Sequence, residues 1–84
     1  MLPIWGVDVY TDDSAVCVAA VHAGAISPRG GVVTVTRGQG QQRYPGGQRN
    51  GVVSYEYGPW PQSFRVTGSA APPVANNPRI PVTK

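Results

Sequence analysis

Short hydrophobic runs alternate with turn-forming residues along the whole chain, and this pattern predicts several strands and a single helix. Residues that favour strands are concentrated in the segment Ile4–Tyr10 and in the run Val32–Thr36. Asn50-Gly51 tolerates the positive φ of a tight turn before a further strand, and residues 58–61 are predicted to form a rigid Pro-containing turn. The predicted strands cover residues 4–10, 32–36, 52–57 and 63–67.

The uncharged run over residues 15–23 predicts a short helix. Thr11 or Asp12 is expected to cap its N-terminus, and Gly24 stands where a left-handed glycine ends a helix. Because the run is apolar on every face, we expect the helix to be buried on all sides and to form the centre of the fold. A buried strand is the alternative, since the run contains β-branched valines.

Composition limits how this chain can be stabilised. Its 84 residues suffice for one small domain with a thin core. The single cysteine excludes an internal disulfide and a four-cysteine metal site. No apolar run is long enough for a membrane span, and the start of the chain lacks the features of a signal peptide. The net charge of +3 permits an anionic partner without requiring one.

Two segments differ in composition from the rest. Residues 38–51 are rich in Gly and Gln and are predicted to form a solvent-exposed loop. From Gly68 onward prolines recur, so we expect a domain over residues 1–67 and an extended, Pro-rich arm over residues 68–84. The apolar side chains of the arm that could be buried on a partner are Val74, Ile80 and Val82.

Few side chains could carry catalysis or bind a metal. His22 and Cys17 lie on different sides of the predicted helix and cannot form a nucleophile–base pair. Cys17 is expected to be buried and unreactive, and His22 to be a core or helix-end residue. Asp8, Asp12 and Asp13 are explained better by helix capping than by a calcium site. We therefore expect no catalytic residue, no metal and no cofactor.

Binding functions fit the sequence better. Arginine and tyrosine side chains, together with several glutamines, are expected on the Gly-rich loop, a composition that suits hydrogen bonding to polar polymers or phosphates. The alternative is a solvated loop whose charges keep the protein soluble. The candidate ligand-binding residues are Arg37, Arg43, Tyr44 and Arg49.

The aromatic residues allow two interpretations. They form the aromatic part of a small core, or several of them share an exposed face and make a platform for sugar stacking or partner binding. The sequence alone does not distinguish these. The residues concerned are Trp5, Tyr55, Tyr57, Trp60 and Phe64.

Residues 10–26 carry the pattern Y-x-x-x-S-x-x-C-x-A-A-x-H-x-G-x-I, and this segment closely resembles the LCCL domain. The resemblance continues through residues 30–35, Tyr44, 50–54 and 63–66, and it covers roughly residues 4–67. It implies an α+β fold, mostly β, in which antiparallel strands wrap one central buried helix. Members of the family commonly carry an N-terminal segment with further cysteines, one of which pairs with the cysteine of this motif. That segment is absent here, so Cys17 is predicted to be free.

The resemblance implies a non-catalytic module that binds lipid, lipopolysaccharide or other polyanionic surface material. Taken with the composition, it leaves two hypotheses. In the first, the chain is an accessory structural protein that docks onto the protein subunits of a larger assembly, for example a virus particle or a surface layer, through its Pro-rich arm. In the second, it is a carbohydrate-, lipid- or lipopolysaccharide-binding module that uses the Arg/Gln/Tyr loop. Nucleic acid is not an expected partner of either.

Overall fold

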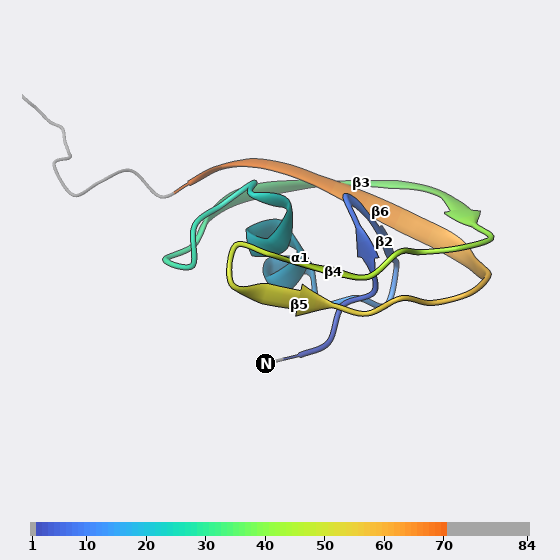
Figure 1. The fold of residues 1–84 in the computed structure, drawn as a ribbon. Coiled ribbons are helices and arrows are strands. Elements are labelled where there is room, and N and C mark those ends of the chain that lie inside the picture. The colour runs from blue at the N-terminus through green and yellow to red at the C-terminus, as the bar shows by residue number, and fades with distance from the viewer. Residues whose placement is uncertain (1, 71–84) are drawn as a thin grey trace, which may run out of the picture.

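Helix α1 lies between two antiparallel sheets in the computed structural model, which describes residues 2–70 (Figure 1). One sheet has four strands in the order β1-β2-β6-β3, and the other is the hairpin β4-β5. The predicted fold class, mostly β with one central helix, is confirmed. The elements are β1 (Gly6–Val7), β2 (Val9–Thr11), α1 (Val16–Ala23), β3 (Gly31–Gln41), β4 (Gly47–Arg49), β5 (Val52–Ser54) and β6 (Trp60–Ala70).

Strands β3 and β6 form a long two-stranded ribbon that spans the molecule (Figure 1). The predicted strands over 32–36 and 63–67 are its central part, but each observed strand has 11 residues. The turn predicted over 58–61 is wrong in its second half, because Trp60 and Pro61 belong to β6. Gly40 lies against the backbone of these two residues, where a Cβ atom would clash. The glycine therefore permits close strand approach rather than a turn.

The N-terminal segment forms two short strands instead of the single strand expected over 4–10. Val7 pairs with Val9, and Asp8 between them has a φ of 67°. Gly6 has a φ of 109°, and a Cβ atom there would strike the Val9 carbonyl oxygen. The chain thus reverses within three residues, which a pattern of alternating strand formers does not reveal.

Helix α1 is confirmed as a helix, but its predicted N-cap is wrong. The N-cap is Ala15, which has no side chain to cap the helix, whereas Thr11 ends strand β2. The Thr11 hydroxyl is instead hydrogen-bonded to Ser14 Oγ at 2.9 Å. At the other end Gly24 has the expected left-handed conformation, with a φ of 81°.

The helix is buried on its inner face only. Ala19 and Ala20 are fully buried, but Val16 is 37% exposed and Cys17 is exposed. The expectation of burial on every side is therefore wrong, and so is the expectation of a buried Cys17. The two sheets cover the helix without enclosing its first turn, so an apolar sequence on all faces does not require a covering layer on all faces.

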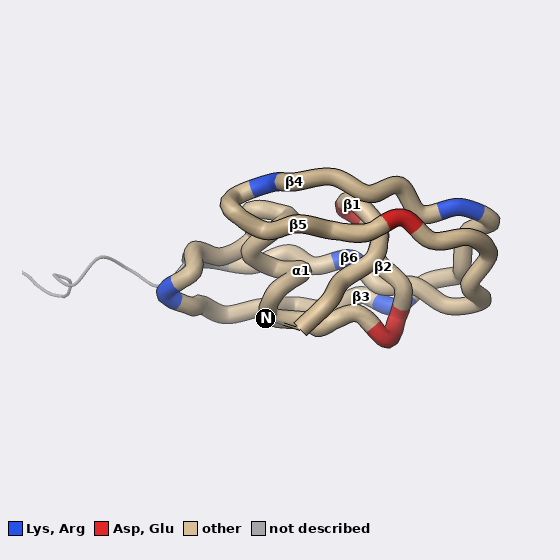
Figure 2. The backbone as a smooth tube through the Cα atoms, turned by 60° about the horizontal axis from the view of Figure 1, so that its bottom comes forward, with Lys and Arg blue, Asp and Glu red and all other residues tan. Residues whose placement is uncertain are grey.

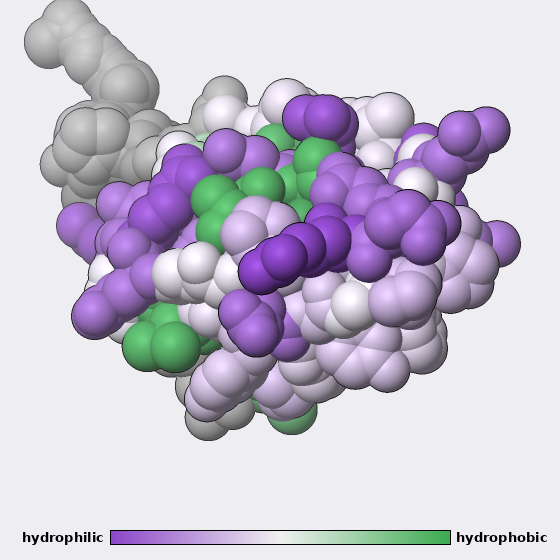
Figure 3. All heavy atoms as spheres, turned by 45° about the vertical axis from the view of Figure 1, so that its right-hand side comes forward, coloured by the Kyte–Doolittle hydropathy of each residue, from purple (hydrophilic) through white to green (hydrophobic). Residues whose placement is uncertain are grey.

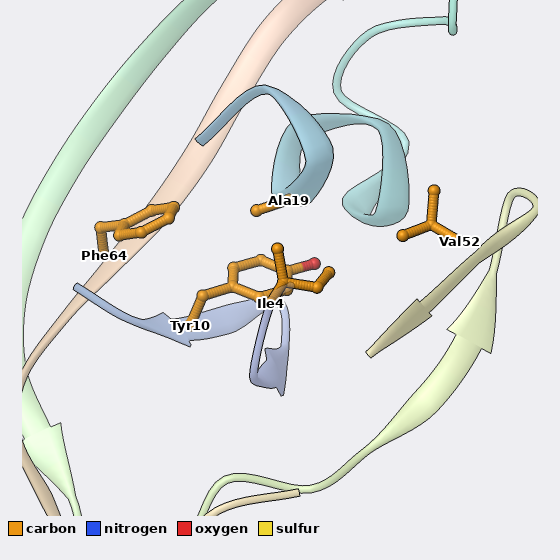
Figure 4. Packing of buried hydrophobic residues seen from close by; sticks show 5 residues of the cluster. All are labelled: Ile4, Tyr10, Ala19, Val52 and Phe64. Atoms are coloured by element: carbon orange, nitrogen blue, oxygen red, sulfur yellow. The ribbon is translucent and has the colours of Figure 1, made fainter. Parts of the chain in front are cut away.

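The core brings together residues from the N-terminal segment, the helix and both sheets. Ile4, Tyr10, Ala19, Val52 and Phe64 pack against one another (Figure 4). Tyr10 and Phe64 face each other on paired strands, with ring centroids 5.8 Å apart. Of the aromatic residues with two possible interpretations, Phe64 is thus a core residue.

His22 joins the helix to both sheets from inside the core. Its Nε2 lies 3.0 Å from the Gly47 carbonyl oxygen, which can only accept, so Nε2 carries the proton. Nδ1 then accepts a hydrogen bond of 2.8 Å from the Tyr10 hydroxyl. The side chain of Asn50 donates to the His22 carbonyl oxygen at 3.0 Å. The expected role of His22 as a satisfied core residue is confirmed.

The segment 38–51 is mostly exposed, as predicted, but the prediction that all of it forms a loop is wrong. Residues 38–41 continue strand β3, and β4 occupies residues 47–49. Tyr44 is fully buried, and its hydroxyl is hydrogen-bonded to the backbone of Gln41 and Trp60 at the end of the ribbon. The strand predicted over 52–57 is β5 for its first half, followed by single bridges at Tyr55 and Tyr57.

The predicted arm begins within strand β6, which runs to Ala70, and its remaining residues lie outside the described part of the chain. This applies to Val74, Ile80 and Val82. No helix within residues 2–70 has the length and hydrophobicity needed to cross a membrane.

The packing of α1 predicts that its two sides differ in their tolerance of larger residues. Ala20→Leu adds volume to a fully buried site and should lower the free energy of unfolding by about 1–3 kcal/mol. Val16→Leu, on the exposed first turn, should change it by less than about 0.5 kcal/mol. Chemical denaturation measures both values. Equal destabilisation by the two changes would contradict the observed orientation of the helix.

Burial raises the pKa of Tyr10, which predicts a loss of stability in alkali. The unfolded chain releases this proton near pH 10 and the folded chain does so only at higher pH. The stability contribution is therefore complete below pH 10 and is lost as the pH rises through the raised value. Tyr10→Phe should lower stability at pH 7 by about 1 kcal/mol, because His22 Nδ1 loses its partner, and should flatten the alkaline decline. Urea denaturation measures the stability of both proteins. If the stability of Tyr10→Phe falls as steeply above pH 10 as that of the unaltered protein, groups other than Tyr10 cause the loss.

Candidate functional site

Three aromatic side chains gather around a hollow of about 290 Å³ at one end of the molecule. They come from the N-terminal segment, the connection between β5 and β6, and the start of β6. We call this the aromatic hollow, and its lining residues are Trp5, Thr11, Asp13, Tyr57 and Trp60.

Backbone hydrogen bonds hold the Trp5 side of the hollow. The Trp5 amide donates to Ser14 Oγ at 3.0 Å, and its carbonyl oxygen accepts from the Thr11 amide at 3.1 Å. Trp5 also forms a parallel bridge with Tyr55. Because Ser14 and Thr11 are buried, this wall is fixed to the turn that follows β2.

Tyr44 positions the other two aromatic walls from within the core. Its amide and carbonyl groups pair with those of Tyr57 at 2.8 and 2.9 Å. Its hydroxyl donates to the Trp60 carbonyl oxygen at 3.1 Å and accepts from the Gln41 amide at 3.0 Å. The buried tyrosine therefore sets the spacing of Tyr57 and Trp60 without reaching the hollow itself.

Two carboxylates lie at the rim of the hollow. Asp12 Oδ1 accepts a hydrogen bond of 2.7 Å from Trp60 Nε1, and its Oδ2 is 4.0 Å from the guanidinium of Arg37. Asp13 lines the hollow and is exposed. Figure 2 shows this acidic turn after β2 beside a basic position of β3.

The four residues expected on one ligand-binding loop are separated by the fold. Arg37 lies on β3 near Asp12, and Arg49 on β4 is 3.0 Å from Asp8. This contact with the Asp8 carboxylate raises the pKa of the Arg49 guanidinium. Tyr44 is in the core, and Arg43 lines a different, shallow hollow with Glu56 and Tyr57. The structure therefore does not gather these side chains into one basic surface.

The candidate catalytic and metal-binding side chains do not form a site. His22 is fully buried and bonded through both ring nitrogens, whereas Cys17 is exposed. Across residues 2–70 no group of three or more His, Cys, Asp or Glu side chains is arranged to hold a metal ion. Within the described residues, the aromatic hollow combines aromatic side chains with a carboxylate, groups that suit contact with a polar ligand.

A sequence profile of the LCCL domain matches residues 1–64, which include every residue of the hollow. The chain belongs to the LCCL domain family. Membership confirms the resemblance of residues 10–26 and supports a non-catalytic binding module. Membership of the family applies to the domain, because the match ends before the last part of the chain.

Segments similar to this chain occur in several known proteins, and each matched segment covers most of the chain. Human vitrin is 42% identical over 66 residues, which are 79% of this chain and 10% of vitrin. Human cochlin is 41% identical over 64 residues, 76% of this chain and 12% of cochlin. Clotting factor C of Tachypleus tridentatus is 37% identical over 62 residues, 74% of this chain and 6% of that protein. The chain thus spans about a tenth or less of these relatives.

The sequence names the three aromatic residues of the hollow as one possible exposed platform, but it does not link Thr11 or Asp13 to them. Trp5, Tyr57 and Trp60 were among the aromatic residues assigned either to the core or to an exposed platform. The structure places them between these interpretations, since Trp5 and Trp60 are half-buried and Tyr57 is 44% exposed. The sequence favours a helix-capping role for Asp13 over a calcium site, and nothing in its local pattern indicates that it lies beside Trp5, Tyr57 and Trp60.

Exposure of Cys17 predicts that its thiol reacts in the native state. A water-soluble thiol reagent should modify the folded protein nearly as fast as the denatured protein, since α1 presents the side chain to solvent. Cys17→Ser should change the free energy of unfolding by less than about 0.5 kcal/mol. Labelling that occurs only when the protein unfolds would show that Cys17 is buried in the native state. Mass spectrometry of timed samples distinguishes the two outcomes.

Proposed function

We propose that this LCCL domain is a glycan-binding module in which a sugar ring occupies the aromatic hollow. The observation that carries the proposal is the convergence of Trp5, Tyr57 and Trp60 on one hollow with a carboxylate at its rim. Aromatic rings pack against the C–H faces of sugars, and carboxylates accept hydrogen bonds from sugar hydroxyls. The volume of about 290 Å³ suits one ring of a longer polymer.

The character of the surface favours a polar ligand over a lipid chain. Figure 3 shows a face that is mostly hydrophilic, with hydrophobic residues in small separate areas. A site for an acyl chain would need a larger continuous apolar surface or an apolar tunnel. The saccharide part of a surface polysaccharide or lipopolysaccharide is therefore the ligand that fits the hollow.

The test compares two exposed tyrosines, of which only one lines the hollow. Tyr57 lines the hollow, whereas Tyr55 is two positions away, is 54% exposed and does not line it. Tyr57→Ala should weaken binding of the polysaccharide released from lipopolysaccharide by about three- to ten-fold, and Tyr55→Ala should leave it unchanged. Isothermal titration calorimetry measures the dissociation constants, and thermal melting confirms that both variants fold.

Arg43→Glu separates this proposal from binding by the basic residues. Arg43 is exposed and lies outside the hollow, so its charge reversal should alter affinity by less than two-fold at physiological salt. Loss of binding in Arg43→Glu with full binding in Tyr57→Ala would overturn the proposal in favour of the Arg-containing surface. Docking through Val74, Ile80 and Val82 remains a prediction from the sequence.

A further inference from the structure

The rings of the aromatic hollow stand at steep angles to one another. Tyr57 makes an interplanar angle of 66° with Trp5 and of 79° with Trp60, with centroid distances of 6.4 and 5.7 Å. Rings in this arrangement form the walls of a box rather than a flat platform. A box of ring faces surrounds a compact group and presents the negative side of each ring quadrupole to it.

The rim of this box carries negative charge that is only partly compensated. Asp12 is engaged by Trp60 Nε1 and lies near Arg37, but Asp13 makes no salt bridge within the described residues. Its carboxylate is exposed at the edge of the hollow. Aromatic walls together with an uncompensated carboxylate attract a cation more strongly than a neutral group of the same size.

The net charge of +3 does not oppose this local attraction. Arg37 lies near Asp12, Arg49 is paired with Asp8, and Arg43 lines the neighbouring hollow together with Glu56, whereas Asp13 at the rim makes no salt bridge within the described residues. At physiological salt, exposed charges are screened over about 8 Å. The groups at the rim therefore determine the field in the hollow.

We infer that the aromatic hollow selects a protonated amine, so that the preferred ligands are glycans containing amino sugars with a free ammonium group. The ammonium group lies among the faces of Trp5, Tyr57 and Trp60, and Asp13 supplies its counter-charge. This inference rests on the proposed function, since it specifies the chemical class of the glycan bound at the same hollow.

A matched pair of ligands tests the inference directly. Oligomers of glucosamine and of N-acetylglucosamine of equal length differ in the charge of the amino group. Both tryptophans of the chain line the hollow, so intrinsic fluorescence reports its occupancy. At a pH where the amines are protonated, the glucosamine oligomer should bind about ten-fold more tightly.

Asp13→Asn is the matched protein variant, because it removes the charge and keeps the shape. It should weaken binding of the glucosamine oligomer by about two- to five-fold more than it weakens binding of the acetylated oligomer. In the unaltered protein, added salt should likewise weaken binding of the glucosamine oligomer more than binding of the acetylated oligomer. Unchanged melting of Asp13→Asn excludes a loss of fold.

The outcomes distinguish this inference from the proposed function. Equal affinity for the two oligomers, with no effect of Asp13→Asn, would overturn the selection of a cation and leave glycan binding intact. Binding of tetramethylammonium that depends on Asp13, without binding of either oligomer, would support the cation site and overturn the glycan ligand. Binding of none of the three probes would overturn both.

Discussion

The buried imidazole of His22 holds the two sheets at a fixed distance across the helix. Its two ring nitrogens are bonded to the Tyr10 hydroxyl of β2 and to the Gly47 carbonyl oxygen of β4. The Tyr10 hydroxyl is buried and would lose its partner if the ring moved, and an unpaired buried polar group is costly. In a core this thin, one satisfied polar link determines the geometry as much as the surrounding hydrophobic contacts do.

The aromatic hollow depends on that arrangement through Tyr44. This residue lies in the connection between the ribbon and β4, which His22 anchors at Gly47, and it pairs through its backbone with Tyr57. The hydroxyl of Tyr44 also holds the Trp60 carbonyl oxygen. The half-buried rings of the aromatic hollow are thus supported by a fully buried ring, which fixes the positions of the walls.

The sequence predicted the parts of this fold that depend on local patterns. The uncharged run before Gly24 predicted α1 and its end, and the valine-rich run over 32–36 predicted the centre of β3. Local patterns did not reveal that Gly40 allows close strand contact, because its contact with Trp60 and Pro61 is distant in sequence. They also did not reveal the reversal at Asp8, because a run of strand formers gives no sign of a positive φ within it. The same limit applies to the hollow, since Trp5, Asp13 and Trp60 are distant in sequence and meet only through strand pairing.

Strand β2 closes the core by pairing with β6, and this connection has a consequence for the order of events during synthesis. Tyr10 meets Phe64, and the Ser54 hydroxyl reaches the Ile4 carbonyl oxygen across 50 positions. The first two strands of the domain can therefore pair only with each other, and β2 lacks its second neighbour until almost the entire domain has been synthesised. Loop-closure entropy is lost before these contacts form, so folding is slow for a chain of this length. Until β6 has been synthesised, the N-terminal half of the domain exposes surface that is buried in the folded state. Its polar residues, and any chaperone that binds it, then have to prevent aggregation.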